Sequence, residues 1–242
     1  MTAGPLDGRR IVVTRPADQA EPLVQRLRAV GAEPIVVPLI EIVDAADGGA
    51  ALAGALDRLD EFEWLVVTSP NGARRVASAL ANTSAGRPRV AAVGTATAAE
   101  LGRVAELVPD EQIAAALVEA FPSGTGRVLV AQAEIAGGEV AAGIAAKGWT
   151  VEAVAAYGTR PVRPTSAHLL AALSAQAVLF ASGSAVRSWT AVFGLETPPL
   201  VIAIGPATAA VAEELGLKVD AVAADHSLDG LVSCVLTSLV GS

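Results

Sequence analysis

Cysteine, histidine and aromatic residues are all scarce in this sequence. Among its 242 residues are one cysteine, Cys234, and two histidines, His168 and His226, and aromatic residues make up 3%. A single cysteine permits no intramolecular disulfide, which is typical of a protein from a reducing cytoplasm. The two histidines are far apart and lack metal-ligand spacing, so a zinc or iron–sulfur site is not expected. With so few aromatic residues, the core must consist of Ala, Val, Leu and Ile.

Positive charge and long apolar runs are lacking too. The net charge is −8 and the pI is about 4.8, whereas a duplex-binding protein normally has a basic face and a high pI. No apolar run reaches the roughly 18 residues that a membrane-spanning helix needs, and the N-terminus shows no apolar signal segment. We therefore expect a cytoplasmic protein that binds neither nucleic acid nor a membrane.

Two phosphate-binding motifs are missing from the chain. It contains no G-x-x-x-x-G-K-[ST] loop and no G-x-G-x-x-G motif after a strand. These absences disfavour a P-loop NTPase and leave dinucleotide binding without its usual sequence pattern. No pair of carboxylates stands out for acid–base catalysis either.

Short runs of valine, isoleucine and leucine alternate with longer amphipathic stretches along the chain. Strands are expected at Ile11–Thr14, Ile35–Val37, Trp64–Thr68, Val90–Val93, Val128–Ala131, Ala177–Phe180 and Leu200–Ile204. Helices are expected at Glu21–Val30, from about Asn71 to Leu80 and from about Thr95 to Gly102. Apolar strands separated by helices predict an α/β fold with parallel sheets covered by helices on both faces.

An internal repeat organises the chain. The segment VVTSPNG reappears as LFASGSA, AAVGTATAAELG reappears as AIGPATAAVAEELG, and GRRIVVT reappears as GRVLVAQ. The offset between the copies is roughly 111 to 118 residues. A repeat of this kind predicts two similar lobes.

Two extended connectors, VPLIEIV and VAAYGTRP, leave the arrangement of the lobes open. If each connector crosses to the other lobe, lobe one holds 1–36 plus 163–242, lobe two holds 44–153, and 37–43 and 154–162 are hinge strands. If neither crosses, the lobes are consecutive halves of the chain. The repeat alone does not decide between the two arrangements.

Four strand ends run into turns that contain Ser, Thr or Gly and open a helix. They contain Ser69 and Asn71, then Thr97, then Ser182, Gly183 and Ser184, and finally Gly205 and Thr208. Ligands bind at the carboxyl ends of parallel strands, where helix starts offer unpaired N–H groups. If these turns face one cleft, they form an anion-binding surface with little formal charge. The simpler interpretation is that these residues only cap helices.

Arg15 and Tyr157 are further candidates. Arg15 follows the first strand and could pair with a substrate carboxylate through two hydrogen bonds, or it could be an ordinary surface arginine. Tyr157, the single tyrosine, lies on the second connector and could donate a hydrogen bond to a ligand or simply pack in the hinge.

The ordered set of motifs resembles uroporphyrinogen-III synthase. The segments IVVTRP, VVPLIEI, WLVVTSPNG, AAVGTATA, AAYGTRP, ASGSAV and AIGPATAAVAEELG follow one another as in that family and cover nearly the whole chain. The resemblance implies two α/β lobes joined by a two-stranded ladder, with the first lobe built from both chain ends. It favours the arrangement in which the connectors cross.

The resemblance also implies a reaction. Family members act on hydroxymethylbilane, a linear tetrapyrrole with acetate and propionate side chains, and they use no metal or organic cofactor. They invert the last ring and close the macrocycle with loss of water, through an azafulvene cation and a spiro intermediate. Such an enzyme must fix geometry more than supply strong acid or base.

Carried over to this sequence, the resemblance assigns residue roles. Tyr157 matches the family tyrosine proposed to assist departure of the hydroxyl group. Binding of the substrate falls to Arg15, Ser69, Asn71, Thr97, Ser182, Gly183, Ser184, Gly205 and Thr208. Ala181 departs from the pattern, because the other repeat has Thr68 there.

Three other functions compete with this one. They are a two-lobed non-enzymatic protein that binds small anions, a two-lobed transferase for a nucleotide-activated donor, and a regulatory protein of the same fold. We expect a monomer whose partner is a small-molecule substrate, and the upstream bilane-producing enzyme is a candidate protein partner.

Overall fold

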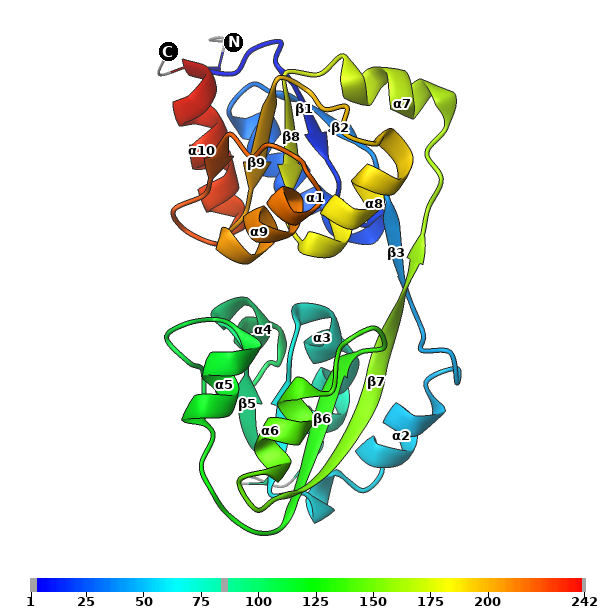
Figure 1. Ribbon diagram of the computed structural model, residues 1–242, viewed down its shortest axis with the longest axis vertical. Helices are drawn as coiled ribbons and strands as arrows, with labels where there is room; N and C mark the ends of the chain where they lie inside the picture. Colours follow the sequence, from blue (N-terminus) through cyan, green and yellow to red (C-terminus); the bar gives the residue numbers. More distant parts are fainter. Residues whose placement is uncertain (1–3, 84–86, 241–242) are drawn as a thin grey trace. The chain divides into compact units, whose positions relative to one another are not determined.

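The fold consists of two α/β units (Figure 1). The structure is a computed structural model that describes residues 4–83 and 87–240. Unit 1 comprises Met1–Glu41 and Arg160–Ser242, and unit 2 comprises Ile42–Thr159. The expected domain boundaries (1–36 plus 163–242, 44–153, and the hinge strands 37–43 and 154–162) stay a prediction. Residues 1–3 and 241–242 of the expected first lobe lie outside the described residues.

Unit 1 is built on a five-stranded sheet in the order β10-β9-β8-β1-β2. Its strands are β1 (Arg10–Val13), β2 (Glu33–Val36), β8 (Ala177–Phe180), β9 (Leu200–Ala203) and β10 (Ala221–Val222). Neighbouring strands pair in parallel throughout the sheet. The carboxyl ends of the strands therefore lie along one edge.

Helices cover both faces of this sheet. They are α1 (Ala17–Ala29), α7 (Ser166–Leu173), α8 (Gly183–Phe193), α9 (Pro206–Glu214) and α10 (Leu228–Val240). Ile11 and Val13 pack against α1 and α10, whereas Val12 packs on the opposite face against α7, α8 and α9. Alternate residues of one strand thus enter two separate cores, which explains why the strand is apolar throughout.

Unit 2 has a sheet of the same size in the order β3-β7-β6-β4-β5. Its strands are β3 (Ile40–Val43), β4 (Trp64–Val67), β5 (Arg89–Ala92), β6 (Arg127–Ala133) and β7 (Thr150–Pro161). The pairs among β4, β5, β6 and β7 are parallel. The boundaries between the two units fall within β3 and β7, so the chain passes from one unit to the other twice, each time in a strand.

The helices of unit 2 also lie on both faces of its sheet. They are α2 (Ala50–Leu56), the short 3-10 helix η1 (Leu59–Glu61), α3 (Pro70–Ala81), α4 (Thr95–Glu100), α5 (Ala114–Ala120) and α6 (Glu139–Ala145). Leu65 and Val67 enter the core formed with α2 and α3, and Trp64 and Val66 enter the core formed with α5 and α6.

The structure confirms the expected fold class, with parallel sheets and helices on both faces. Each expected strand is present, with ends that differ by a few residues. The first helix begins at Ala17, earlier than expected. Apolar periodicity did not indicate this start, because Asp18 and Gln19 occupy the first turn. No helix among the described residues is both long and apolar enough to span a membrane.

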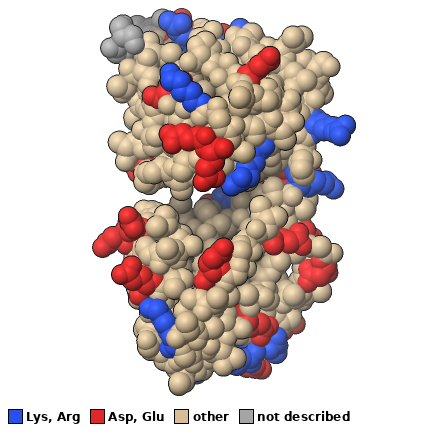
Figure 2. Space-filling model, in the orientation of Figure 1, with Lys and Arg blue, Asp and Glu red and all other residues tan. Residues whose placement is uncertain are grey.

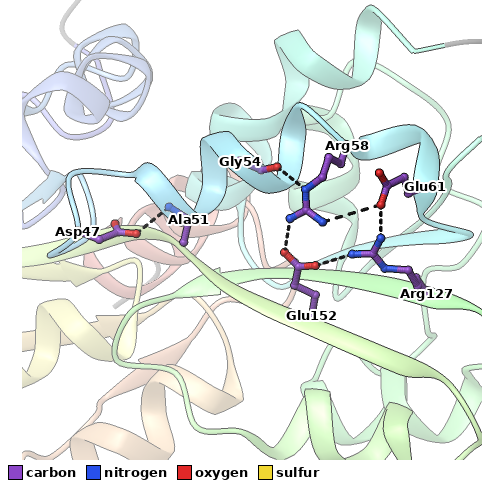
Figure 3. Close-up of polar contacts among 7 residues, drawn as sticks. All are labelled: Asp47, Ala51, Gly54, Arg58, Glu61, Arg127 and Glu152. Carbon is purple, nitrogen blue, oxygen red and sulfur yellow. Dashed lines mark hydrogen bonds and ion pairs between the residues drawn. The ribbon is translucent and has the colours of Figure 1, made fainter.

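Four alternating charges tie η1 to the sheet of unit 2 (Figure 3). The carboxylate of Glu152 on β7 accepts hydrogen bonds from Arg58, at 3.0 Å, and from Arg127, at 2.8 Å. Arg127 also pairs with Glu61, and its guanidinium lies 4.6 Å from the ring centre of Phe62. These contacts fasten the polypeptide before β4 to both β6 and β7.

Asp47 stabilises the start of α2 in the same region (Figure 3). Its carboxylate accepts hydrogen bonds from the backbone N–H groups of Ala51 and Gly49, each at 2.8 Å. These bonds, with that of Ala51 foremost, hold the pKa of Asp47 below its usual value. The lowered pKa means that this contribution to stability is present near neutral pH and is lost as the pH falls through the folded-state pKa.

Replacing Glu152 with glutamine removes the carboxylate that both arginines contact, so it is expected to lower the free energy of unfolding. The loss should be only roughly 1 kcal/mol, because the ion pairs are partly exposed to solvent. The loss should shrink in 1 M NaCl, where charges are screened over about 3 Å. Urea denaturation at low and high salt measures both quantities.

Glu213→Gln on α9 is the matched control, because Glu213 is exposed and has no ion pair among the described residues. Equal losses for the two variants, or a loss at Glu152 that is independent of salt, would contradict a stabilising network.

Candidate functional site

In each unit, two neighbouring strands end in turns that open a helix. In unit 2, β4 leads into α3 and β5 into α4; in unit 1, β8 leads into α8 and β9 into α9. The residues that cap these helices are Ser69, Gly94, Ser182 and Gly205. All four turns lie at the carboxyl edge of their own sheet, where parallel α/β folds bind ligands.

Ser69 and Tyr157 meet at this edge in unit 2. The Ser69 hydroxyl accepts a hydrogen bond from the Gly72 N–H at 3.2 Å and donates one to the Tyr157 hydroxyl at 3.1 Å. The Tyr157 residue is 7% exposed and its ring packs in the core beside α2 and α3. Its carbonyl accepts a hydrogen bond from the Glu134 N–H at 2.9 Å, next to an irregularity in the β6–β7 register. The single tyrosine is therefore held by both its backbone and its hydroxyl.

The other predicted residues of unit 2 have local partners. The Asn71 side-chain oxygen accepts a hydrogen bond from Arg74 at 3.0 Å. Thr97, in the first turn of α4, is 4% exposed. Gln112 accepts a hydrogen bond from the Thr95 N–H at 3.0 Å and fills the space beside Gly94. The sequence analysis did not single out Gln112, because its contact with Thr95 depends on how the chain after α4 folds back over the start of that helix.

The predicted residues of unit 1 form two clusters. Ser182 caps α8 by accepting a hydrogen bond from the Ala185 N–H at 3.3 Å, and its hydroxyl lies 3.0 Å from that of Ser184. At the second turn, the exposed ring of His226 lies so close to Gly205 that an added Cβ would be 3.1 Å from it. Thr208, in the first turn of α9, is 6% exposed.

Close packing explains the glycine at position 183. An added Cβ there would lie 3.0 Å from a methyl group of Val211 on α9, so a side chain at this position would require Val211 to shift. The backbone at the start of α8 consequently carries no side chain at this point.

Arg15 and Thr14 follow β1 at the same edge of unit 1. The Arg15 Nε donates a hydrogen bond to the Gln19 carbonyl at 2.8 Å, which directs this side chain along the first turn of α1. Thr14 is fully buried and donates to the Leu179 carbonyl at 2.8 Å, so it anchors the end of β1 to β8. The structure thus joins Ser69 to Tyr157 and Ser182 to Ser184, while Arg15 and Asn71 bond to residues outside the predicted set.

Charge is sparse over much of the surface. On the face drawn in Figure 2, blue and red side chains form small separate patches in a largely uncharged surface. No group of three or more residues able to hold a metal ion occurs among residues 4–83 and 87–240. Any anion bound at the sheet edges would therefore meet hydroxyls, backbone amides and single arginines.

A cavity of about 450 Å³ lies elsewhere in unit 1, between β10 and α10. Apolar, hydroxyl and acidic residues line it, and Cys234 is among them. Burial raises the pKa of the Cys234 thiol, so this cysteine is protonated at neutral pH and a poor nucleophile. None of the predicted site residues lines the cavity.

Comparisons with known proteins agree on one family. A family model described as "Uroporphyrinogen-III synthase HemD" matches residues 21–233. The uroporphyrinogen-III synthase of Synechococcus elongatus is 31% identical and the match covers 97% of each chain. The chloroplastic uroporphyrinogen-III synthase of Oryza sativa subsp. japonica is 27% identical over 95% of this chain and 80% of that protein.

Solved structures show the same fold. A mutant uroporphyrinogen III synthase from Thermus thermophilus matches with a TM-score of 0.67 at 17% identity, over 93% of this chain and 96% of that one. The uroporphyrinogen-III synthetase of Helicobacter pylori matches with a TM-score of 0.57 at 17% identity, over 96% and 99% of the two chains.

Ser69→Ala and Ser182→Ala each remove a helix cap, and each is expected to lower the free energy of unfolding by about 1 kcal/mol. Only Ser69→Ala should also alter the environment of the Tyr157 hydroxyl. Because the chain has one tyrosine, the ¹³Cζ NMR signal of labelled tyrosine reports this directly. An unchanged signal in Ser69→Ala, or an equal shift in Ser182→Ala, would show that the Ser69–Tyr157 hydrogen bond is absent in solution.

Proposed function

The chain belongs to the uroporphyrinogen-III synthase family, and we propose that it cyclises hydroxymethylbilane to uroporphyrinogen III. The reaction inverts the terminal pyrrole ring and releases water, which makes the protein a lyase. The observation that carries the proposal is the hydrogen bond between Ser69 and Tyr157 at the carboxyl edge of unit 2.

The contacts of Tyr157 suit a group that assists departure of a hydroxyl. The Gly72 N–H donates to Ser69, and Ser69 in turn donates to the Tyr157 oxygen, which leaves the phenolic proton to point elsewhere. A phenol that accepts one hydrogen bond becomes a better donor for the next, because hydrogen bonds in a chain polarise one another. We infer that this proton is offered to the leaving hydroxyl of the bilane.

Ring closure balances without an added reagent. The hydroxyl leaves as water after taking a proton, and the resulting azafulvene cation is attacked by the substituted carbon of the terminal pyrrole. The spiro intermediate then fragments and recloses with that ring inverted, and the reacting pyrrole loses a proton at the end. The chain must mainly hold the substrate in the productive geometry, which is where binding contributes most to rate.

Binding of the substrate carboxylates is assigned to the sheet edges of the two units. The proposed residues are Arg15, Ser69, Asn71, Thr97, Ser182, Gly183, Ser184, Gly205 and Thr208. The one hydroxyl proton of Ser69 is donated to Tyr157 and is not available to a carboxylate, so within this set we assign Ser69 a positioning role toward Tyr157. The nearly complete burial of Thr97 and Thr208 favours contacts through the backbone of their helix starts.

The remaining proposals concern partners and location. We propose that the protein acts as a cytoplasmic monomer without metal or organic cofactor and without nucleic-acid or membrane partners. The upstream bilane-producing enzyme is the proposed protein partner, because its product is unstable and closes spontaneously to the wrong isomer.

Identification of the product isomer tests the function. Enzymatically generated hydroxymethylbilane is mixed with the protein, the product is oxidised, and the porphyrin isomers are separated. We expect the type III isomer to dominate with the protein and the type I isomer without it. Type I product alone would favour a binding or regulatory protein of this fold.

Tyr157→Phe is expected to lower kcat roughly 100-fold, which is at the lower end of the effect of removing a proton donor. The phenyl ring preserves the packing, so the urea midpoint should change little. An unchanged kcat and type III yield in a folded Tyr157→Phe protein would exclude a catalytic role for the phenol.

A further inference from the structure

The helix pairs α3/α4 and α8/α9 are structural counterparts in the two units. Trp64 pairs with Arg89 between β4 and β5, and the repeat partners Ala177 and Leu200 pair between β8 and β9. Ser69 and Ser182 cap α3 and α8 in the same way, each accepting from the N–H three residues on. The repeat therefore defines which residues correspond.

Arginine follows the cap by five residues in both units. In unit 2 this residue is Arg74, which holds the Glu100 carboxylate of α4 through two hydrogen bonds of 3.0 and 2.7 Å. A third hydrogen bond joins Arg74 to Asn71. The charge of Arg74 is thus neutralised inside the unit.

The corresponding arginine in unit 1, Arg187, has lost both of these partners. Val211 stands where α4 has Glu100, and its contact with Gly183 places it beside the start of α8. Ser184 stands where α3 has Asn71, and its hydroxyl is engaged with Ser182. Arg187 is exposed, and its guanidinium makes no hydrogen bond or ion pair with any other residue in 4–83 or 87–240.

The position of Arg187 suits contact with a ligand at the sheet edge. Five residues of helix correspond to a rise of roughly 7.5 Å from Ser182. Side chains on a helix lean toward its N-terminus, and α8 begins at the carboxyl edge, so a long side chain at this position can extend back toward the Ser182 turn. Its planar fork matches a carboxylate in the same two-bond manner that Arg74 shows with Glu100.

We propose that Arg187 binds a carboxylate of the substrate, in the place that Glu100 takes beside Arg74. The proposal rests on the proposed function, because it takes the substrate to be a polycarboxylate. It predicts an asymmetry: the free guanidinium of unit 1 contributes to binding, and the paired guanidinium of unit 2 does not.

The test compares Arg187→Gln with Arg74→Gln. Arg187→Gln is expected to raise the KM for hydroxymethylbilane about 10-fold, which is the loss of one hydrogen-bonded ion pair, with kcat within about twofold. Arg74→Gln should change KM by less than about threefold. Arg187→Lys keeps the charge and should recover part of the affinity.

Fluorescence titration with uroporphyrin III separates this proposal from the proposed function. This polycarboxylate needs no turnover, and its affinity should fall about 10-fold in Arg187→Gln at low salt and less at high salt. Wild-type protein that yields no type III product would defeat the proposed function alone. Equal KM and equal titrations for wild type and folded Arg187→Gln, equal losses at Arg74, or no recovery with lysine would overturn the role of Arg187.

Discussion

Burial of parallel strands on both faces is the constraint on which the rest of this structure depends. A strand such as β1 places Ile11 and Val13 in one core and Val12 in another, so these side chains are not available for chemistry. Only the residues that follow the carboxyl ends of the strands emerge, and there they cap helices. Most of the candidate site residues consequently lie in or next to short turns such as the one at Ser69, which must also satisfy the backbone of a helix, and Tyr157 on β7 is the exception.

Small differences between the repeats give the two units different side-chain contacts at their sheet edges. Ser69 and Ser182 cap equivalent helices, but the Ser69 hydroxyl continues to Tyr157 whereas that of Ser182 continues to Ser184. Duplication supplies two similar sheets with similar helix caps, and the residues that differ at the sheet edges determine which side-chain contacts each unit makes. Unit 2 contains the phenol that we propose as the proton donor, and unit 1 has no counterpart because the chain has one tyrosine.

The fold could be predicted from the sequence because its signal is local and repeated. Apolar runs such as IVVT and WLVV mark strands regardless of their neighbours, and the capping serines mark helix starts. The side-chain contacts could not be predicted in this way. The Ser69–Tyr157 bond joins residues 88 positions apart, and the approach of His226 to Gly205 depends on how a loop folds over a turn. Such contacts follow from packing rather than from spacing, so the sequence could indicate where the candidate residues lie along the chain but not what their side chains contact.

Stability and catalysis are coupled differently in the two units. Tyr157 lies in a core and its hydroxyl accepts a hydrogen bond from Ser69, so anything that loosens this core also moves the phenol that we propose as the proton donor. Of the groups assigned to binding in unit 1, Ser182 and Ser184 are partly exposed, whereas Gly205 and Thr208 are buried. None of these residues belongs to a strand, so the sheet itself does not depend on their side chains. The proposed proton donor of unit 2 therefore depends on core packing, whereas the proposed carboxylate contacts of both units depend on the residues that follow the strands.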